Sequence, residues 1–185
     1  EGSKAFMKNL CKKNNIPTAN FGVFDNFDDA SSFIKKNKTP IVVKADGLAA
    51  GKGVSVCLSP EEALKNTKDI LEGKFKSSHK VVLEEFLEGE ELSYFAIVDE
   101  NSYLFFGSAQ DHKRVGEGDT GPNTGGMGAY SPAPLLTNEL EKKIKKKIIE
   151  PTIKAMKALG HPYKGFLYAG LMIKKDEPYL IEYNI

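Results

Sequence analysis

The chain has 185 residues, of which 41% are hydrophobic and 28% charged, and its formal net charge is +1. These proportions are typical of a globular protein, and a net charge near zero gives no indication of bulk electrostatic attraction to nucleic acid or to a membrane surface. The longest hydrophobic runs are too short to span a bilayer. Because Cys11 and Cys57 form no C-x-x-C pair, we expect reduced, buried thiols in a cytoplasmic protein.

The first part of the chain predicts a small α+β lobe over residues 17–86, preceded by one helix. The pattern over residues 4–14 predicts that helix, with Phe6, Leu10 and Cys11 on its inner side and lysines facing outward. The expected elements that follow are a strand over 19–24, a helix over 27–36 begun by Asn26, strands over 40–45 and 54–57, and a helix over 60–71 capped by Ser59 and ended by Gly73.

A glycine-rich segment, residues 46–53, connects the third and fourth of these elements. Glycines let backbone N–H groups approach a phosphate, because no Cβ is in the way, and Lys44 would add a positive charge. The spacing is not that of a Walker loop, and the segment is followed by a strand, whereas a dinucleotide fingerprint requires a helix. The pattern therefore predicts either a hairpin that covers a phosphate or a mobile turn without a ligand.

The middle of the chain predicts an antiparallel meander of strands over residues 80–87, 92–98 and 103–109. The first strand ends in Glu84-Glu85-Phe86-Leu87, and Glu91 follows. Backbone groups at such a point can contact the edge of an adenine, and a carboxylate can hold a ribose hydroxyl group. An ordinary acidic strand end would have the same sequence.

A long loop rich in glycine and proline is expected over residues 110–134, and it carries the only arginine of the sequence, Arg114. Loops of this length inside a compact domain are usually functional or disordered. Arginine and lysine can clamp one anionic group, and glycine N–H groups can hold another. The alternative is an Ω-type loop packed by its own side chains.

The last part of the chain predicts one long helix and two strands. Hydrophobic residues at helical spacing follow Thr137, Pro151 is expected to bend or restart the helix, and Gly160 ends it. Strands are expected over residues 165–173 and 179–184. Alternation along the last strand would place Leu180, Glu182 and Asn184 on one face. Carboxylate and amide oxygens suit a hard cation such as Mg²⁺, although a solvent-facing polar edge would have the same pattern.

Taken in order, these motifs resemble the ATP-grasp domain of the phosphoribosylamine–glycine ligase (glycinamide ribonucleotide synthetase) family. The resemblance covers essentially the whole chain and implies an α+β, ATP-grasp fold, in which two lobes with antiparallel sheets enclose the nucleotide. The matching segments are Lys4-Ala5-Phe6, residues 44–54, residues 84–87, residues 110–114, residues 121–132 and residues 165–171.

The resemblance also implies an activity. Enzymes of this family join glycine to 5-phosphoribosylamine with ATP, through glycyl phosphate, and give glycinamide ribonucleotide, ADP and phosphate in de novo purine biosynthesis. Catalytic roles would fall on Lys44, Lys113 and Arg114, and Mg²⁺ (or Mn²⁺) on Glu182 and Asn184. ATP would contact Lys4, Lys44, Gly47, Gly51, Lys52, Gly53, Glu84, Glu85, Phe86, Leu87 and Glu91. The substrate side would comprise Asp111, Lys113, Arg114, Asn123, Thr124, Gly125 and Gly126.

The sequence departs from many ATP-grasp enzymes on the strand expected over 165–173, where they carry a second metal-binding carboxylate and this chain has Ala169 and Gly170. Both chain ends resemble cuts through a longer enzyme, so an incomplete catalytic unit is expected. Another ATP-grasp carboxylate–amine ligase, or a nucleotide-binding module without turnover, are the alternatives. Neither a nucleic acid nor a membrane is an expected partner, and the sequence does not predict the oligomeric state.

Overall fold

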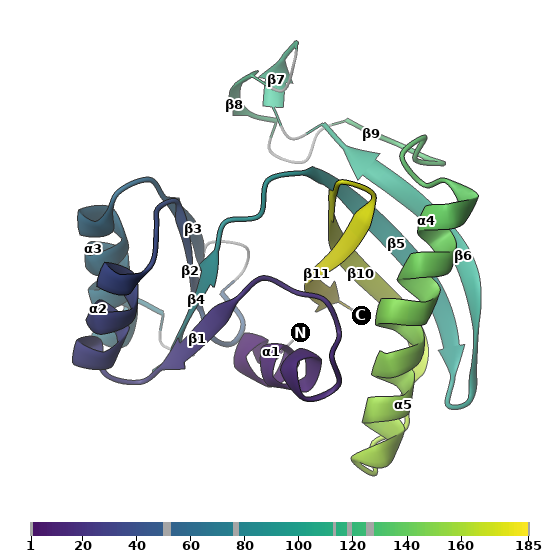
Figure 1. Cartoon of the computed structure of the whole chain (residues 1–185), viewed down its shortest axis with the longest axis horizontal. Coiled ribbons are helices and arrows are strands. Elements are labelled where there is room, and N and C mark those ends of the chain that lie inside the picture. Colours follow the sequence, from purple (N-terminus) through teal and green to yellow (C-terminus); the bar gives the residue numbers. More distant parts are fainter. Residues whose placement is uncertain are drawn as a thin grey trace. The chain divides into compact units, whose positions relative to one another are not determined.

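The computed structural model describes residues 2–49, 53–75, 78–112, 114–117, 120–124 and 128–184. The chain divides into two compact units (Figure 1). The first consists of residues 1–13 and 18–87, and the second of residues 14–17 and 88–185. Both units combine helices with an antiparallel sheet, so the predicted α+β class is confirmed. None of the helices in the described part of the chain has the length and hydrophobicity needed to cross a membrane.

The first unit contains a four-stranded antiparallel sheet. Its strands lie in the order β1 (Phe21–Phe24), β4 (Val81–Glu85), β2 (Ile41–Ala45) and β3 (Val54–Cys57). Helices α2 (Phe27–Lys36) and α3 (Pro60–Leu71) cover one face, as Figure 1 shows. The hydrophobic core between helices and sheet contains Ala30, Ile34, Ile41, Val43, Ala45, Cys57, Ala63, Ile70, Val81 and Leu83.

Strand β4 corrects the predicted meander. It pairs with β1 and β2 inside the first unit, whereas β5 and β6 belong to the other sheet. The physical reason is the hydrophobic run from Val81 to Leu83, which is buried throughout. A run without alternation is typical of a strand with both faces covered, and a central position in the smaller sheet provides that burial. Strand β1 is also shorter than the strand expected over 19–24, since it begins at Phe21.

Local capping explains why α2 and α3 have the predicted bounds. The Asn26 side chain accepts a hydrogen bond from the Asp29 N–H at 3.0 Å, and Ser59 Oγ accepts one from the Glu62 N–H at 3.2 Å. Both are N-cap bonds that satisfy a free N–H in the first turn. Gly73 follows α3 with a φ of +95°, a conformation in which glycine is favoured after a helix.

Helix α1 (Lys4–Lys13) is rotated relative to the expected orientation. Phe6 was expected to face inward but is 50% exposed, and Lys8 was expected to face outward but is fully buried. The buried stripe runs through Ala5, Lys8 and Cys11, which are three residues apart and share one helix face. A lysine is found at such a position only when a partner compensates the cost of burying its charge.

The second unit contains a five-stranded antiparallel sheet. Its strands lie in the order β11 (Glu177–Asn184), β10 (Lys164–Lys174), β5 (Glu90–Asp99), β6 (Ser102–Asp111) and β9 (Ala129–Tyr130). Strands β7 (Arg114–Gly116) and β8 (Thr120–Asn123) form a separate two-stranded ribbon. The stretch over 110–134, predicted as one long loop, therefore contains regular pairing: β7 with β8, and β9 with the end of β6.

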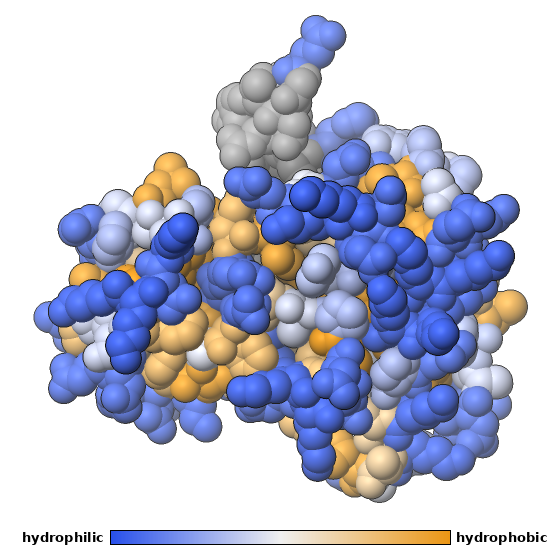
Figure 2. All heavy atoms as spheres, in the orientation of Figure 1, coloured by the Kyte–Doolittle hydropathy of each residue, from blue (hydrophilic) through white to orange (hydrophobic). Residues whose placement is uncertain are grey.

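One continuous helical run covers a face of this sheet (Figure 1). It comprises α4 (Asn138–Ile144), a π-helical segment η1 (Lys145–Ile149) and α5 (Glu150–Ala158). The π-helical segment ends two residues before Pro151, whose missing N–H and bulky ring disturb the regular α-helical bonds. The predicted bend at Pro151 stays a prediction. Figure 2 shows the outer side of this run as hydrophilic. Its inner side buries Leu140, Ile144, Ile148, Ile149 and Ile153.

Candidate functional site

Three charged side chains meet inside the first unit. Lys44 on β2 and Glu84 on β4 lie on the sheet face opposite the hydrophobic core, because Glu84 is opposite Val42 in the register and Val42 shares a face with Lys44. The Lys44 Nζ lies 3.0 Å from Glu84 Oε1. The Lys8 Nζ of α1 lies 2.8 Å from Glu84 Oε2 and donates to Thr18 Oγ1 at 2.7 Å. We name Lys8, Glu84 and Lys44 the buried charge cluster.

The buried charge cluster holds two ammonium groups and one carboxylate. The side chains of Lys8, Glu84 and Lys44 are 0%, 4% and 8% exposed. Burial lowers the pKa of Lys8, the Glu84 charge opposes that effect, and the Lys44 charge adds to it. When Lys8 is protonated the cluster carries a surplus positive charge in a place that water reaches poorly. Such a site attracts an anion more strongly than a surface lysine does.

Asp46 connects helix α1 to the beginning of the glycine-rich segment. Its Oδ1 accepts hydrogen bonds from the Ala5 N–H at 3.0 Å and from Ser3 Oγ at 3.1 Å. Ser3 Oγ accepts in turn from the Phe6 N–H at 3.0 Å, as an N-cap does. Beside these bonds, the Lys4 Nζ donates to the Gly47 carbonyl oxygen at 2.9 Å. Lys4 is therefore held against the segment that was predicted to cover a phosphate.

The ends of this segment have the geometry of a glycine hairpin. Gly47 has a φ of +86°, in a region where side chains are disfavoured. At the other end, the Gly53 carbonyl oxygen accepts from the Ala45 N–H at 2.7 Å. A Cβ on Gly53 would lie 2.5 Å from the Ala49 Cβ, so a side chain would not fit without a shift. Gly51 and Lys52, two predicted ATP contacts, lie outside the described residues.

The acidic segment at the end of β4 has two carboxylates with different partners. Glu84 contacts the two lysines above, whereas the Glu85 carboxylate accepts from the Asn20 N–H and from Asn20 Nδ2, each at 3.1 Å. Phe86 is 38% exposed, Leu87 is 9% exposed, and Glu91 is exposed on β5. Their predicted contacts with adenine and ribose remain predictions.

Glu182 and Asn184 lie together on β11 in the second unit. Asn184 Nδ2 donates to Glu182 Oε1 at 3.2 Å, which leaves Glu182 Oε2 and Asn184 Oδ1 as oxygen donors of the kind that Mg²⁺ prefers. The donor set therefore fits a hard cation. Among the described residues no group of three or more His, Cys, Asp or Glu side chains could hold a metal.

The register of β11 corrects the predicted position of Leu180. Leu180 is opposite Leu171 and Glu182 is opposite Gly170, so Ile181 is an extra residue, a β-bulge that breaks the alternation. Leu180 is therefore fully buried on one face, while Glu182 and Asn184 lie on the other. A Cβ on Gly170 would come within 3.3 Å of Glu182 Cγ. The glycine at position 170 therefore leaves room for the Glu182 side chain. Position 170 is one of the two at which the expected second metal-binding carboxylate is missing.

The substrate residues predicted between positions 111 and 126 are only partly described. Asp111 ends β6 and is opposite Ala129, and the backbones of Arg114 and Asn123 are opposite each other in the β7–β8 ribbon. Thr124 Oγ1 donates to the His112 carbonyl oxygen at 2.7 Å. Lys113, Gly125 and Gly126 lie outside the described residues.

The sequence interpretation missed Lys8 and the role of Asp46. A signal for Lys8 was available, because it lies between Ala5 and Cys11 on a three-residue spacing that defines one face of a helix. For Asp46 no local signal exists, since its partners Ser3 and Ala5 are more than forty residues away.

Comparison with known proteins agrees with this fold. A family model described as "Phosphoribosylglycinamide synthetase, ATP-grasp (A) domain" matches residues 2–185. Phosphoribosylamine–glycine ligase of Brucella melitensis is 55% identical over 185 residues, and the chloroplastic form of Arabidopsis thaliana is 56% identical over 189 residues. The crystal structure of phosphoribosylamine–glycine ligase from Thermotoga maritima has a TM-score of 0.91 at 40% identity.

Each of these three alignments covers 100% of this chain but only 43%, 36% and 47% of the respective relative. The chain thus spans less than half the length of the relatives it matches. The ATP-grasp fold expected from the resemblance is confirmed. Because the family model matches the chain from its second residue to its last, the chain belongs to the phosphoribosylglycinamide synthetase ATP-grasp (A) domain family.

Proposed function

We propose that this chain is the ATP-binding part of a phosphoribosylamine–glycine ligase, which joins glycine to 5-phosphoribosylamine in purine biosynthesis. The names of the relatives support this activity. Because the chain spans 43% of the Brucella relative, we propose an incomplete catalytic unit. Both cysteines are buried and free, which supports a reducing, cytoplasmic environment.

The observation that carries the proposal is the buried charge cluster together with Lys4 at the start of the glycine-rich segment. Lys44 and Lys4 would contact the phosphates of ATP, and residues 47–53, with Gly51 and Lys52, would close over them, so that the lobe over 17–86 acts as a lid. Main-chain groups of residues 84–87 would contact the adenine, and Glu91 the ribose. Charge-assisted bonds from lysine to phosphate are stronger than neutral ones.

Glu182 and Asn184 would hold Mg²⁺ or Mn²⁺. When bound, the cation neutralises charge on the phosphates during transfer. Glu182 supplies a carboxylate oxygen and Asn184 an amide oxygen, and the hydrogen bond between their side chains orients both. Gly170 keeps the space next to Glu182 open.

In this reaction the protein positions the reactants and supplies positive charge, and no covalent nucleophile is needed. A carboxylate oxygen of glycine would attack the γ-phosphorus of ATP. Glycyl phosphate would form as the bond between the γ-phosphorus and the ADP oxygen breaks. The amine of phosphoribosylamine would then attack the acyl carbon, phosphate would leave, and an amide would form. Lys113 and Arg114, with Asp111 and residues 123–126, would contact the acyl phosphate and the amine.

Calorimetric titration of the chain with ATP and MgCl₂ tests the proposal. Lys44→Met should weaken ATP binding by about tenfold or more, because a charge-assisted bond to phosphate is lost. Lys154→Met, at an exposed position on α5, is the matched control and should bind ATP as the wild type does. Glu182→Gln should raise the MgCl₂ concentration needed for half-maximal binding.

Three results would each contradict a part of the proposal. Equal ATP affinity of Lys44→Met and the wild type would exclude the phosphate role of Lys44, and an unaltered metal titration of Glu182→Gln would exclude the metal role of β11. Glycine-dependent ADP formation by this chain alone, at the rate of a full-length relative, would show that the unit is complete.

A further inference from the structure

Lys8 has the most complete burial of any charged side chain in the described part of the chain, and the proposed function gives it no contact with ATP. Its side chain is 0% exposed, and its ammonium group lies 5.7 Å from the centre of the Phe21 ring. Lysine is almost never fully buried unless it is paired. The position of Lys8 beside Glu84 therefore calls for a physical explanation.

Hydrophobic stability does not explain this lysine. Met7, Leu10 and Cys11 are its buried neighbours on α1, so a methionine at position 8 would match the hydrophobic side chains of its own helix. Replacing a buried ion pair by hydrophobic residues of similar volume is often neutral or stabilising. What Lys8 adds, and a methionine would not, is a positive charge 2.8 Å from Glu84 Oε2.

The two oxygens of Glu84 are divided between the two lysines. Oε2 contacts Lys8 and Oε1 contacts Lys44, so the carboxylate charge is shared. Without Lys8, the full negative charge of Glu84 would act on Lys44 alone, and the cluster would be neutral. A neutral pair attracts a phosphate far less than a cluster with a surplus positive charge.

We propose that Lys8 is a positioning residue of the nucleotide site, whose buried ammonium group balances Glu84 so that Lys44 keeps its positive charge available for a phosphate of ATP. This inference rests on the proposed function, because it assigns Lys44 to the nucleotide. Lys8 itself does not contact the phosphate in this proposal. It acts through Glu84, so removing the charge of Glu84 should compensate for the loss of Lys8.

The test measures ATP affinity by calorimetry, in the presence of MgCl₂, for Lys8→Met, Glu84→Gln and the double variant. Lys8→Met should weaken ATP binding about tenfold, a difference of about 1.4 kcal/mol. The double variant again leaves one lysine charge in the cluster, with a neutral amide beside it. Its ATP affinity should return to within about threefold of the wild type, which is about 0.7 kcal/mol. Lys12→Met, at an exposed position on the same helix, is the control and should change nothing.

Recovery in the double variant separates positioning from a structural role. If Lys8 only supported the fold, removing Glu84 as well would not restore binding, so a folded double variant that binds ATP as weakly as Lys8→Met would overturn the inference. Wild-type affinity in Lys8→Met would overturn it as well. If Lys8→Met does not fold in a thermal unfolding assay, the double variant, which has no carboxylate in the cluster, decides by its affinity alone.

The same measurements distinguish the two proposals. Failure of the wild-type chain and of Lys12→Met to bind ATP would contradict the proposed function. Normal binding by the wild type together with unchanged binding by Lys8→Met would contradict only the role of Lys8.

Discussion

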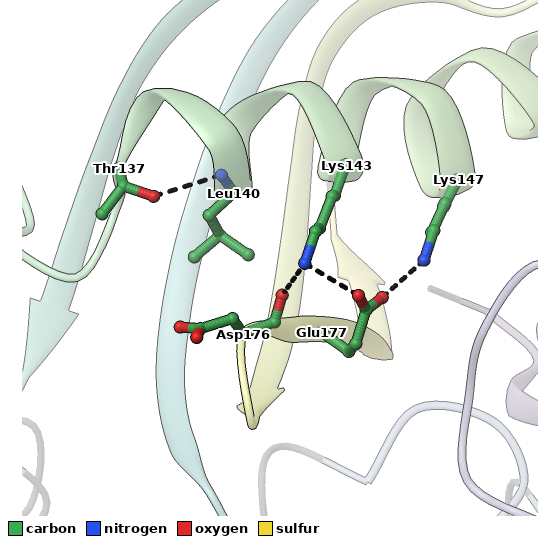
Figure 3. A network of polar contacts seen from close by, with 6 residues as sticks. All are labelled: Thr137, Leu140, Lys143, Lys147, Asp176 and Glu177. Atoms are coloured by element: carbon green, nitrogen blue, oxygen red, sulfur yellow. Dashed lines mark hydrogen bonds and ion pairs between the residues drawn. The ribbon is translucent and has the colours of Figure 1, made fainter.

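Two carboxylates in this protein each lie between two lysines, one in each unit. Glu84 contacts Lys8 and Lys44 in the first unit. In the second unit, Glu177 contacts Lys143 at 2.8 Å and Lys147 at 2.5 Å (Figure 3). The contacts are alike in composition and length, but the side chains of the first group are at most 8% exposed, while those of the second are 34–43% exposed.

Burial gives the two groups different physical consequences. Around Glu177, the hydrogen bonds from Lys143 and Lys147 are the main causes that lower the pKa of the carboxyl group. Around Glu84, desolvation is the main effect and lowers the pKa of Lys8. Water and salt screen the exposed group, so its lysines gain little from pairing. In the buried group, loss of Glu84 would leave two ammonium groups without a compensating charge.

The largest expected effect is the loss of Glu84. Glu84→Ala leaves two buried ammonium groups without a carboxylate, and removal of one partner from a buried pair costs about 3–5 kcal/mol of unfolding free energy. Glu177→Ala, the matched change at the exposed group, should cost at most about 1 kcal/mol. Urea unfolding of both variants measures the difference. Equal losses in the two variants would contradict the explanation by burial.

Asp46 provides an intermediate case, since it is partly buried and its main-chain partner, the Ala5 N–H, is in the first turn of α1. Asp46→Ala should cost about 1–2 kcal/mol of unfolding free energy, the value of a lost helix cap. It should also weaken ATP binding, because the cap positions Lys4. Asp46→Asn keeps an oxygen acceptor and should lose less stability. The two measurements are urea unfolding and calorimetric titration with ATP.

A double-variant comparison sharpens this prediction. If Asp46 acts on the nucleotide through Lys4, Asp46→Ala should weaken ATP binding further only when Lys4 is present. Equal additional weakening in a Lys4→Met background would show that Asp46 affects binding by another route.

The parts of the fold that the sequence predicted best are those fixed by local interactions. Helices α2 and α3 begin at caps formed by Asn26 and Ser59 within three residues of their partners, so their bounds can be predicted from the sequence. The sheet to which β4 belongs could not be predicted in this way. Strand pairing joins residues far apart in the sequence, and the pattern of β4 reports burial but not the neighbouring strand.

The candidate site shows the same limit. Glu182 and Asn184 were correctly placed on one face of β11, because alternation holds from residue 182 to residue 184. Leu180 was placed wrongly, since the extra residue Ile181 depends on pairing with β10. The hydrophobic pattern of α1 was too weak to show that Phe6 is exposed and Lys8 buried. Only Glu84, 76 residues further along the chain, explains why a lysine is buried there.

The smallest expected effect concerns pH and Glu177. Its pKa in the folded protein is lowered, so the ion pairs contribute stability above the unfolded-state pKa, about 4.3 for a glutamate, and this contribution is lost as the pH falls through the lowered folded-state value. Glu177→Gln should therefore be less stable than the wild type at neutral pH by at most about 1 kcal/mol. The difference should disappear in acid and shrink in about 1 M NaCl.

Thermal unfolding at several pH values and salt concentrations measures this difference. Lys142→Gln, at an exposed position on the same helix as Lys143, removes one charge outside the group and serves as the control. A difference between Glu177→Gln and the wild type that persists unchanged in acid would exclude ionisation of Glu177 as its cause. A difference that persists at high salt would show that the exposed group behaves like the buried charge cluster, because only interactions hidden from solvent escape screening.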